Sequence, residues 1–192
     1  MSEFPSLRTA RLLLRGFRPA DRAPFAALNA DPEVMRHFPS TLTAAESEAS
    51  VEGIEQHWRR HGFGLWAVER LADGDFLGFV GLAVPGFSAP FTPSVEIGWR
   101  LSRAAWGAGY ATEGARAALR FGFVDQDLDE IVSFTVPANA RSRRVMERLG
   151  MTHAPAEGFE HPRLPVGHPL RPHVLYRLRR SEWREEGAEK AR

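Results

Sequence analysis

The sequence predicts one α/β or α+β domain built around a single mixed sheet. Strand and helix patterns alternate along the chain, and a hairpin signal at Asp73-Gly74 stands beside strand–helix–strand units. At 192 residues the chain is long enough for one sizeable core and short for two. No repeat or linker of different composition divides it. We therefore expect one domain over residues 1–183, followed by a charged, disordered tail at 184–192.

The N-terminal part is expected to contain one strand, three helices and a hairpin. The ranges are a strand at 11–17, helices at 19–29, 31–37 and 43–61, and hairpin strands at 65–71 and 76–84. Asp31-Pro32 offers a cap and a first turn for the short second helix. Thr43 and Glu46 have the spacing of a capping box, which favours a long third helix that Gly62 ends.

The C-terminal part is expected to contain three strands and two helices. The ranges are strands at 94–101, 130–137 and 173–179, and helices at 112–124 and 140–149. Helices separate these strands, whereas a tight turn joins the earlier pair. A sheet that contains both kinds of connection is mixed.

Composition excludes several classes of function. The net charge is +1, so no global field draws the chain to nucleic acid or to an anionic membrane. No apolar run approaches the length that a bilayer requires, and none follows a basic N-terminus. Cysteine is absent, which excludes disulfides, zinc–thiolate sites and a cysteine nucleophile. We expect a cytoplasmic protein with no nucleic-acid or membrane partner, in which any sulfur chemistry uses the sulfur of a cofactor.

Residues 94–114 run from a strand pattern through a glycine-rich turn directly into a helix pattern. Gly107 and Gly109 can adopt positive φ and have no side chain to block an anion, and Thr112 can cap the helix or add a hydroxyl. Such a turn directs backbone N–H groups and the positive end of a helix dipole at one point. The pattern predicts a pyrophosphate site; the alternative is a plain tight turn. No Gly-Lys-Ser/Thr follows, so it is not a nucleoside triphosphatase loop.

The segment 106–113, Trp-Gly-Ala-Gly-Tyr-Ala-Thr-Glu, resembles the acetyl-CoA pyrophosphate loop of the GCN5-related N-acetyltransferases (GNAT). It is closest to the branch of ribosomal-protein N-terminal acetyltransferases. The segment 139–142, Asn-Ala-Arg-Ser, resembles the second cofactor motif, and the similarity covers roughly residues 7–183. The family usually has Gln or Arg where this chain has Trp106, so the loop is expected to hold phosphate mainly through backbone N–H groups.

The resemblance implies a fold and an activity. The fold is a mostly antiparallel sheet of about six to seven strands flanked by helices, with the fourth and fifth strands splayed at the cofactor site. The activity is direct acetyl transfer from acetyl-CoA to a primary amine, either a protein N-terminus or a small molecule, by a monomer or homodimer. The alternatives are a non-catalytic CoA-binding or regulatory module and a nucleotide-binding regulatory domain.

The resemblance also implies the cofactor-binding residues. They come from the strand before the turn, from the turn itself and from the second motif. These residues are Ile97, Gly98, Trp99, Leu101, Trp106, Gly107, Ala108, Gly109, Tyr110, Ala111, Thr112, Asn139 and Ser142.

Two residues are candidates for proton transfer. Glu96 alternates away from its apolar neighbours and could order a water that accepts the amine proton; the alternative is a solvated or ion-paired carboxylate. Ser142 shares a helix face with apolar residues and could protonate the leaving thiolate; the alternative is a hydrogen bond to the carbonyl four residues earlier. Many relatives carry a tyrosine acid where this chain has Met146, which cannot donate a proton. The weaker candidates for the base are His37, Glu160 and His161.

Other clusters have simpler interpretations. His57 and His61 are spaced i, i+4, but the glutamate of a zinc protease helix is missing, so we expect no metal. Four aromatic residues could wall an acceptor pocket, although core packing is the default for each: Trp58, Trp66, Phe87 and Phe91. The arginines of 116–120 and 141–148 are expected on solvated faces, where one or two could meet the 3′-phosphate of CoA.

Overall fold

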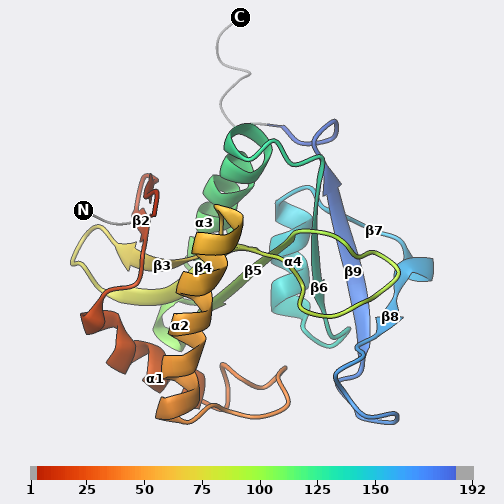
Figure 1. Ribbon diagram of the computed structural model, residues 1–192, viewed down its shortest axis with the longest axis horizontal. Helices are drawn as coiled ribbons and strands as arrows, with labels where there is room; N and C mark the ends of the chain where they lie inside the picture. Colours follow the sequence, from red (N-terminus) through yellow and green to blue (C-terminus); the bar gives the residue numbers. More distant parts are fainter. Residues whose placement is uncertain (1–3, 185–192) are drawn as a thin grey trace, which may run out of the picture.

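The computed structural model describes residues 4–184 and contains a sheet of nine strands with four α-helices (Figure 1). The strands are β1 (Leu7–Arg8), β2 (Leu12–Arg15), β3 (Leu65–Arg70), β4 (Phe76–Ala83), β5 (Glu96–Leu101), β6 (Glu130–Thr135), β7 (Thr152–His153), β8 (Phe159–Glu160) and β9 (Pro172–Arg179). The order is β1-β2-β3-β4-β5-β6-β9-β7, and β8 pairs with β9. The predicted tail lies, from residue 185 onward, outside the described residues.

The predicted mixed, mostly antiparallel sheet is confirmed. Every strand pair is antiparallel except β5 and β6, which run parallel. The sheet has nine strands rather than six to seven, because three two-residue strands were not predicted. Two of them, β7 and β8, form only because β9 lies beside them, a partner that no local pattern reveals.

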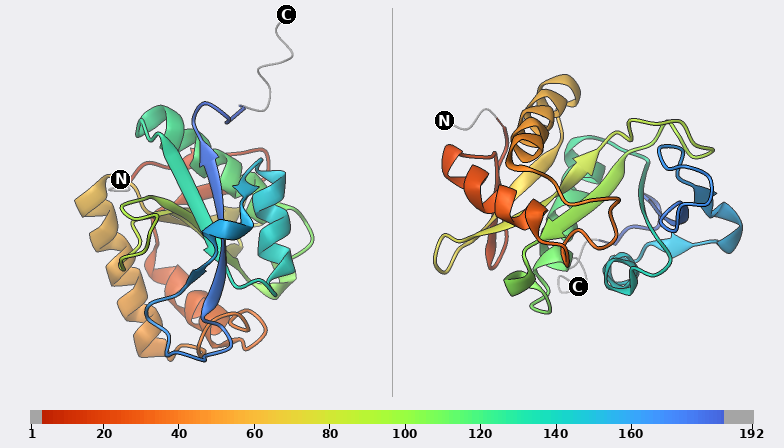
Figure 2. Two further views of the ribbon diagram at one scale, coloured as in Figure 1. Left: turned by 90° about the vertical axis from the view of Figure 1, so that its right-hand side faces the viewer. Right: turned by 90° about the horizontal axis from the view of Figure 1, so that it is seen from below.

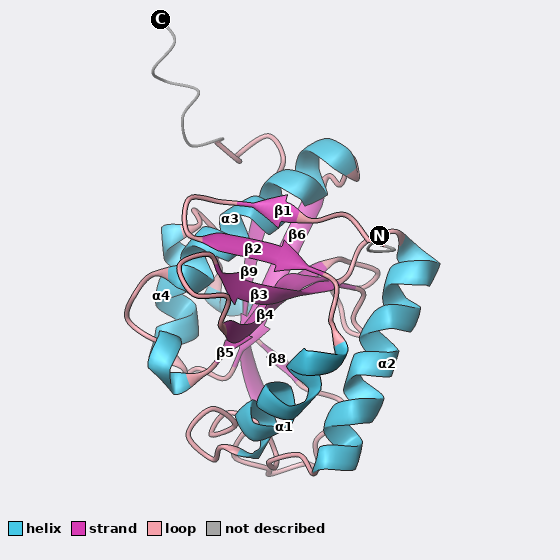
Figure 3. Cartoon of the chain, turned by 90° about the vertical axis from the view of Figure 1, so that its left-hand side faces the viewer, coloured by secondary structure: helices cyan, strands magenta, loops and turns pink. Residues whose placement is uncertain are grey.

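The four helices lie on two sides of the sheet (Figure 3). They are α1 (Arg22–Ala30), α2 (Ala44–His61), α3 (Tyr110–Arg120) and α4 (Ala140–Arg148). The main core lies between the sheet and α3 and contains Leu12, Val80 and Ile97. A smaller core on the opposite face joins α1 and α2 to β4 through Phe25 and Phe79.

The helix signals in the sequence are mostly confirmed. The Thr43 hydroxyl accepts from Glu46 N at 3.2 Å, and the Glu46 carboxylate accepts from Thr43 N at 2.7 Å, so the predicted capping box starts α2. Gly62 ends that helix with φ 74°. At the end of α3 the chain continues as a π-helix over Phe121–Asp125.

The predicted short helix at 31–37 is wrong. Asp31 does cap a turn, because its carboxylate accepts from Glu33 N at 2.8 Å and its carbonyl accepts from Met35 N at 3.0 Å. The turn does not continue as a helix, since so few residues cannot offset the cost of nucleation and Pro39 follows. The segment instead forms a loop, and the ring of Phe38, which follows it, contacts the Arg100 guanidinium near the end of β5.

The gap between β5 and β6 is the feature of the fold that matters most for the site. The two strands pair only at Glu96 and Val132, with a bond of 2.8 Å from Val132 N to Val95 O. Beyond that point they diverge (Figure 1), while β6 continues beside β9 (Figure 2). The predicted splay of the fourth and fifth long strands is therefore confirmed.

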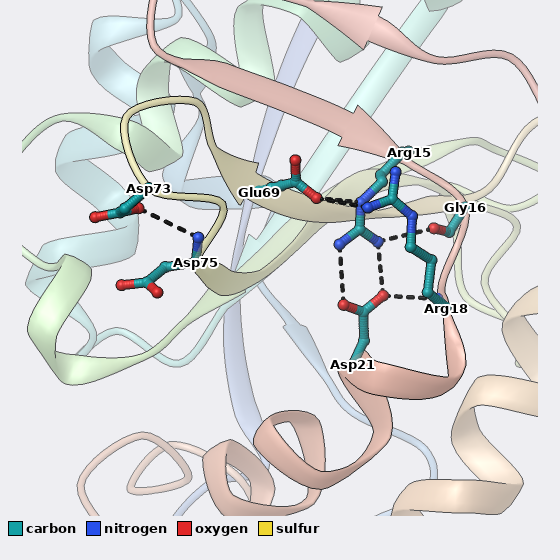
Figure 4. A network of polar contacts seen from close by, with 7 residues as sticks. All are labelled: Arg15, Gly16, Arg18, Asp21, Glu69, Asp73 and Asp75. Atoms are coloured by element: carbon teal, nitrogen blue, oxygen red, sulfur yellow. Dashed lines mark hydrogen bonds and ion pairs between the residues drawn. The ribbon is translucent and has the colours of Figure 1, made fainter.

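A buried ion network fixes the N-terminal strands to α1 (Figure 4). The Arg15 guanidinium donates to both oxygens of Asp21, at 2.6 and 3.0 Å, and to Glu69 at 2.7 Å. Arg15 and Asp21 are 4% and 3% exposed. Asp21 also accepts from Arg18 N at 2.6 Å, so one carboxylate joins the strand to the start of the helix.

Candidate functional site

A cavity of about 1190 Å³ passes through the gap between β5 and β6. On the α3 side its wall is formed by the turn before α3 and by the first turns of α4. On the opposite side its wall is formed by Phe79 and by two loops, 33–39 and 161–173. Because one continuous space reaches both faces of the sheet, two ligands that enter from opposite sides can meet at β5.

The turn before α3 has the geometry of an anion site. Gly107 and Gly109 have φ of 79° and 83°, the left-handed region that favours glycine. The first hydrogen bond of α3 runs from Glu113 N to Gly109 O at 3.0 Å, so the N–H groups of 110–112 have no intrahelical acceptor. A Cβ on Gly107 would meet nothing within 4 Å, which leaves room for a ligand against the backbone.

Trp106 attaches the turn to the end of β5. Its indole N–H donates to Leu101 O at 2.9 Å, and the Arg141 guanidinium stacks on its ring at 4.3 Å. In the family that the segment resembles, a Gln or Arg side chain usually provides a hydrogen-bond donor at this position. Here Trp106 takes that position and fixes the turn to β5. This geometry agrees with the expectation that backbone N–H groups provide most donors.

A second anchor holds the turn from outside the cavity. Arg11 donates to the Glu113 carboxylate at 2.6 Å and to Ala108 O at 3.0 Å, and the Thr9 hydroxyl donates to the same carboxylate at 2.6 Å. Burial raises the pKa of Glu113, but the hydrogen bonds from Thr9 and Arg11 outweigh it and lower that pKa. Ala108 is the one predicted cofactor residue that does not line the cavity.

The free edge of β5 presents backbone groups to the gap. The carbonyls of Ile97 and Leu101 face it, since Ser133 Oγ donates to the first at 2.9 Å and the Trp106 indole to the second. Alternation along a strand directs the N–H and C=O of Trp99 to the same edge. Beyond the single β5–β6 pairing these groups of Trp99 have no partner in β6.

Asn139 and Ser142 lie at the start of α4, beside the gap. Asn139 caps the helix, because its Oδ1 accepts from Ser142 N at 3.3 Å and its Nδ2 donates to Thr135 Oγ1 at 3.0 Å. Ser142 Oγ lines the cavity and makes no hydrogen bond within residues 4–184, so the alternative of a bond to the carbonyl four residues earlier is not observed. Met146 is 1% exposed and packs in the core.

Glu96 lies at the point where the two strands part. Gly98 follows on the same face of β5, and a Cβ at Gly98 would lie 3.8 Å from the Glu96 carboxylate. No described residue hydrogen-bonds or pairs with this carboxylate, so the salt-bridged alternative is not observed. Burial raises its pKa from 4.5 to about 8. The group therefore changes protonation in the range where amines do.

Several other candidates are not at the cavity. Both nitrogens of His57 are used by backbone, since Nε2 accepts from Val84 N at 3.0 Å and Nδ1 donates to Phe63 O at 2.9 Å. Glu160 is ion-paired with Arg171 at 2.8 Å. The four aromatic residues proposed as pocket walls pack in cores instead: Trp58 and Trp66 in the main core, in ring contact with Phe121 of the π-helix, and Phe87 and Phe91 beside Phe134 of β6. His37 and His161 do line the cavity, where burial lowers the pKa of both.

Sequence reasoning missed the residues of the wall opposite α3. Phe38, Phe79, Phe134 and Arg100 line the cavity on the face opposite α3. Period-2 alternation from Glu96 through Gly98 would have identified Arg100, but no local signal identifies the phenylalanines, which come from three separate segments. Arginines 141, 144 and 148 line the α3 side.

Comparisons with known proteins identify a family and the same fold. The family model described as acetyltransferase (GNAT) domain matches residues 11–152. The FsC-acetyl coenzyme A-N(2)-transacetylase of Aspergillus fumigatus is 35% identical over 93% of this chain and 78% of its own. An acetyltransferase structure from Agrobacterium tumefaciens is 27% identical with TM-score 0.73, over 93% of this chain and 96% of that one. A ribosomal-protein acetyltransferase of Vibrio fischeri, at 15% identity and TM-score 0.70 over 94% and 99%, shares the fold.

Within residues 4–184 no helix is both long and apolar enough to cross a membrane.

Proposed function

The chain belongs to the GNAT acetyltransferase family, and from that premise we propose that it transfers the acetyl group of acetyl-CoA directly to the primary amine of an acceptor. Members of the family are acyltransferase enzymes that generally use acetyl-CoA and an amine acceptor. The observation that carries the proposal for this chain is the cavity through the sheet, with an anion-binding turn on one face and Glu96 at the opening to the other.

The residues of the turn fit the diphosphate of CoA. The N–H groups at the start of α3, the helix dipole behind them and the open backbone at Gly107 together favour a bound anion. The predicted roles of Ile97, Gly98, Trp99, Leu101, Asn139 and Ser142 along the pantetheine arm are consistent with their place at the gap. When bound there, acetyl-CoA supplies the acetyl group as an activated thioester.

The side chains at the gap divide the proton transfers between them. As a carboxylate, Glu96 accepts the proton of the attacking amine, directly or through a water. Backbone N–H groups on the free edge of β5 stabilise negative charge on the carbonyl oxygen. Ser142 Oγ donates its proton to the leaving thiolate, and a proton from water restores the hydroxyl. Cysteine is absent from the chain, so no thiol of the protein can form an acyl-enzyme.

A small amine is the leading acceptor. The relative at 35% identity is named for acetylation at an N(2) position. The alternative is a protein N-terminus, as in the ribosomal-protein branch that segment 106–113 resembles. We place the protein in the cytoplasm, as a monomer or homodimer.

Steady-state kinetics test the proposal. Purified protein is given acetyl-CoA with small primary amines and with peptides that have free N-termini, and mass spectrometry identifies the acetylated product. We expect turnover, and we expect Ser142→Ala to lower kcat about 100-fold with little change in KM for acetyl-CoA. Ser142→Thr keeps a hydroxyl and serves as the matched control. CoA binding without turnover on the whole panel would favour the non-catalytic module, and displacement of CoA by ATP would favour the nucleotide-binding domain.

A further inference from the structure

Arg100 is a cavity-lining cation without an acidic partner. Its Nη1 donates to Asn29 Oδ1 at 2.7 Å, and its Nε is shielded from solvent with no hydrogen-bond partner. No carboxylate of the described chain pairs with it. The contrast with Arg15 is direct, because that buried guanidinium is surrounded by Asp21 and Glu69.

The guanidinium is held in place before any ligand binds. It lies 4.2 Å from the centre of the Phe38 ring and 5.3 Å from that of Phe79. Asn29 is fully buried and donates in turn to Ser47 Oγ at 3.2 Å. These neutral neighbours hold the Arg100 guanidinium at the cavity and do not neutralise its charge. An anionic group of a ligand could therefore pair with it there.

Burial without an opposite charge is unfavourable for a cation. It lowers the pKa of Arg100 to about 10, which still leaves the side chain charged at neutral pH. Arg36, another arginine of the same cavity, differs because Glu33 lies 3.6 Å from it. The missing partner of Arg100 is therefore a specific feature and is not shared by every arginine of this wall.

The position of Arg100 separates it from the cofactor's phosphates. Glu96, Gly98 and Arg100 share one face of β5, whereas Ile97 and Leu101 pack in the core beneath α3. The anion-binding turn lies on the α3 side. An anion that reaches Arg100 therefore enters from the face opposite α3, which is the side left for the acceptor.

We propose that Arg100 binds a carboxylate of the acceptor, so that the substrate is an amine that also carries a carboxylate; this inference rests on the function proposed above. Two guanidinium nitrogens, Nη1 and Nη2, retain N–H groups for a carboxylate. Arg100 lies two residues beyond Gly98, about 7 Å along the strand. The amine and the carboxylate are thus separated by several bonds, as in an ω-amino acid or a peptide.

A series of matched acceptors tests the inference. The ω-amino carboxylates from 3-aminopropanoate to 6-aminohexanoate are each compared with the alkylamine of equal chain length. For wild-type protein we expect kcat/KM to favour the longer carboxylates by about tenfold or more. Arg100→Gln should remove that preference, lowering kcat/KM for the carboxylates about 10- to 100-fold and for the alkylamines less than about twofold. Arg100→Lys should keep part of it, and Arg36→Gln is the matched control that should keep all of it.

A binding measurement makes the result independent of turnover. Thermal unfolding is followed with 6-aminohexanoate and with hexylamine, and only the carboxylate should stabilise the wild-type protein through Arg100. Should Arg100→Gln fail to fold, the same comparison of carboxylates with alkylamines is made in Arg100→Lys, where a smaller preference for carboxylates than in the wild type supports the inference. Turnover without any preference for carboxylates, or an equal loss for both series in the Arg100 variants, overturns the inference and leaves the acetyl transfer standing. Absence of turnover with every amine contradicts the proposed function instead.

Discussion

Glu96 is the residue on which the proposed chemistry turns. Its carboxyl group has a pKa of about 8 because burial disfavours the charged form and no cation lies close enough to oppose that effect. Only the carboxylate can accept a proton. The residue therefore becomes an effective base as the pH rises through 8.

The pH dependence of kcat/KM follows from this pKa. We expect the wild-type value to rise with pH and to level off above about 8, and we expect Glu96→Gln to lose this limb and about 100-fold in rate. Acceptors whose amines differ in pKa distinguish the titration of the amine from that of Glu96. The part of the pH profile that is due to Glu96 keeps the same midpoint with every acceptor, whereas the part due to the amine shifts. Glu33→Gln is the control, since that carboxylate lines the same cavity but pairs with Arg36. A limb that survives in Glu96→Gln contradicts the assignment.

The same pKa predicts a change in stability. The folded protein holds the Glu96 proton up to about pH 8, whereas the unfolded chain releases it near 4.5. Between these values the folded state binds more protons, so the free energy of unfolding decreases as the pH rises. Glu96→Gln carries no charge to bury, and its Tm should exceed the wild-type Tm at pH 9 while the difference vanishes near pH 4. Equal Tm values at pH 9 would show that the carboxylate is well solvated.

Sequence reasoning located single residues where a local pattern marked them. Strand alternation singled out Glu96, and helical spacing placed Ser142 on the same face as buried Met146. It failed where the partner is remote, as for Arg100, which is held by Asn29 from a helix 71 positions away. No pattern in a window of ten or twenty residues contains that contact.

Among the elements, the turn before α3 carries the cofactor hypothesis. Gly107 has φ 79°, a conformation that a β-branched residue adopts only with strain of about 1–2 kcal/mol or more. Gly107→Val should lower affinity for CoA about tenfold or more, measured by calorimetry, because it distorts the backbone that faces the diphosphate.

Gly74 gives a matched control for that substitution. It lies in the hairpin between β3 and β4 with φ 78°, and a Cβ there also meets nothing within 4 Å. Gly74→Val therefore introduces similar strain far from the turn and should leave CoA affinity unchanged. If both variants bind CoA as the wild type does, the turn is only a connection between strand and helix.

The element α1 depends on the buried ion network at its start. Arg15→Met leaves the Asp21 carboxylate buried without its cation, which should lower the free energy of unfolding by about 3–5 kcal/mol in urea titrations. Arg70 pairs with Asp73 and Asp75 at 2.7 Å at the surface, where Arg70→Met should lower the free energy of unfolding far less. Similar losses in the two variants would mean that burial adds nothing to the network.

Helices and turns that depend on residues close together in the sequence were predicted, whereas elements that depend on distant partners were not. The capping box of α2 and the glycines after it are read within a few residues, and both were found. The segment 31–37 has the capping residue of a helix but is too short to form one. Its conformation therefore depends on packing against the rest of the protein. Short strands such as β7 and β8 are defined by pairing with β9 and were missed.

At the scale of the whole molecule, the parting of β5 and β6 is the feature on which the proposed reaction of two substrates depends. A closed sheet would separate the helix-dipole turn from the wall that contains Phe38 and Phe79. The gap instead joins them in one cavity, with Glu96 and Ser142 lining it. The proposed direct transfer relies on this arrangement, because both substrates would reach the same few backbone groups without a carrier residue.

A crystal structure of the protein with CoA bound is the most direct test of this account. We predict the diphosphate within hydrogen-bond distance of the N–H groups of residues 107–112, and the pantetheine arm between β5 and β6 with its sulfur near Ser142 Oγ. CoA bound elsewhere, or an arm that does not enter the gap, would contradict the central claim.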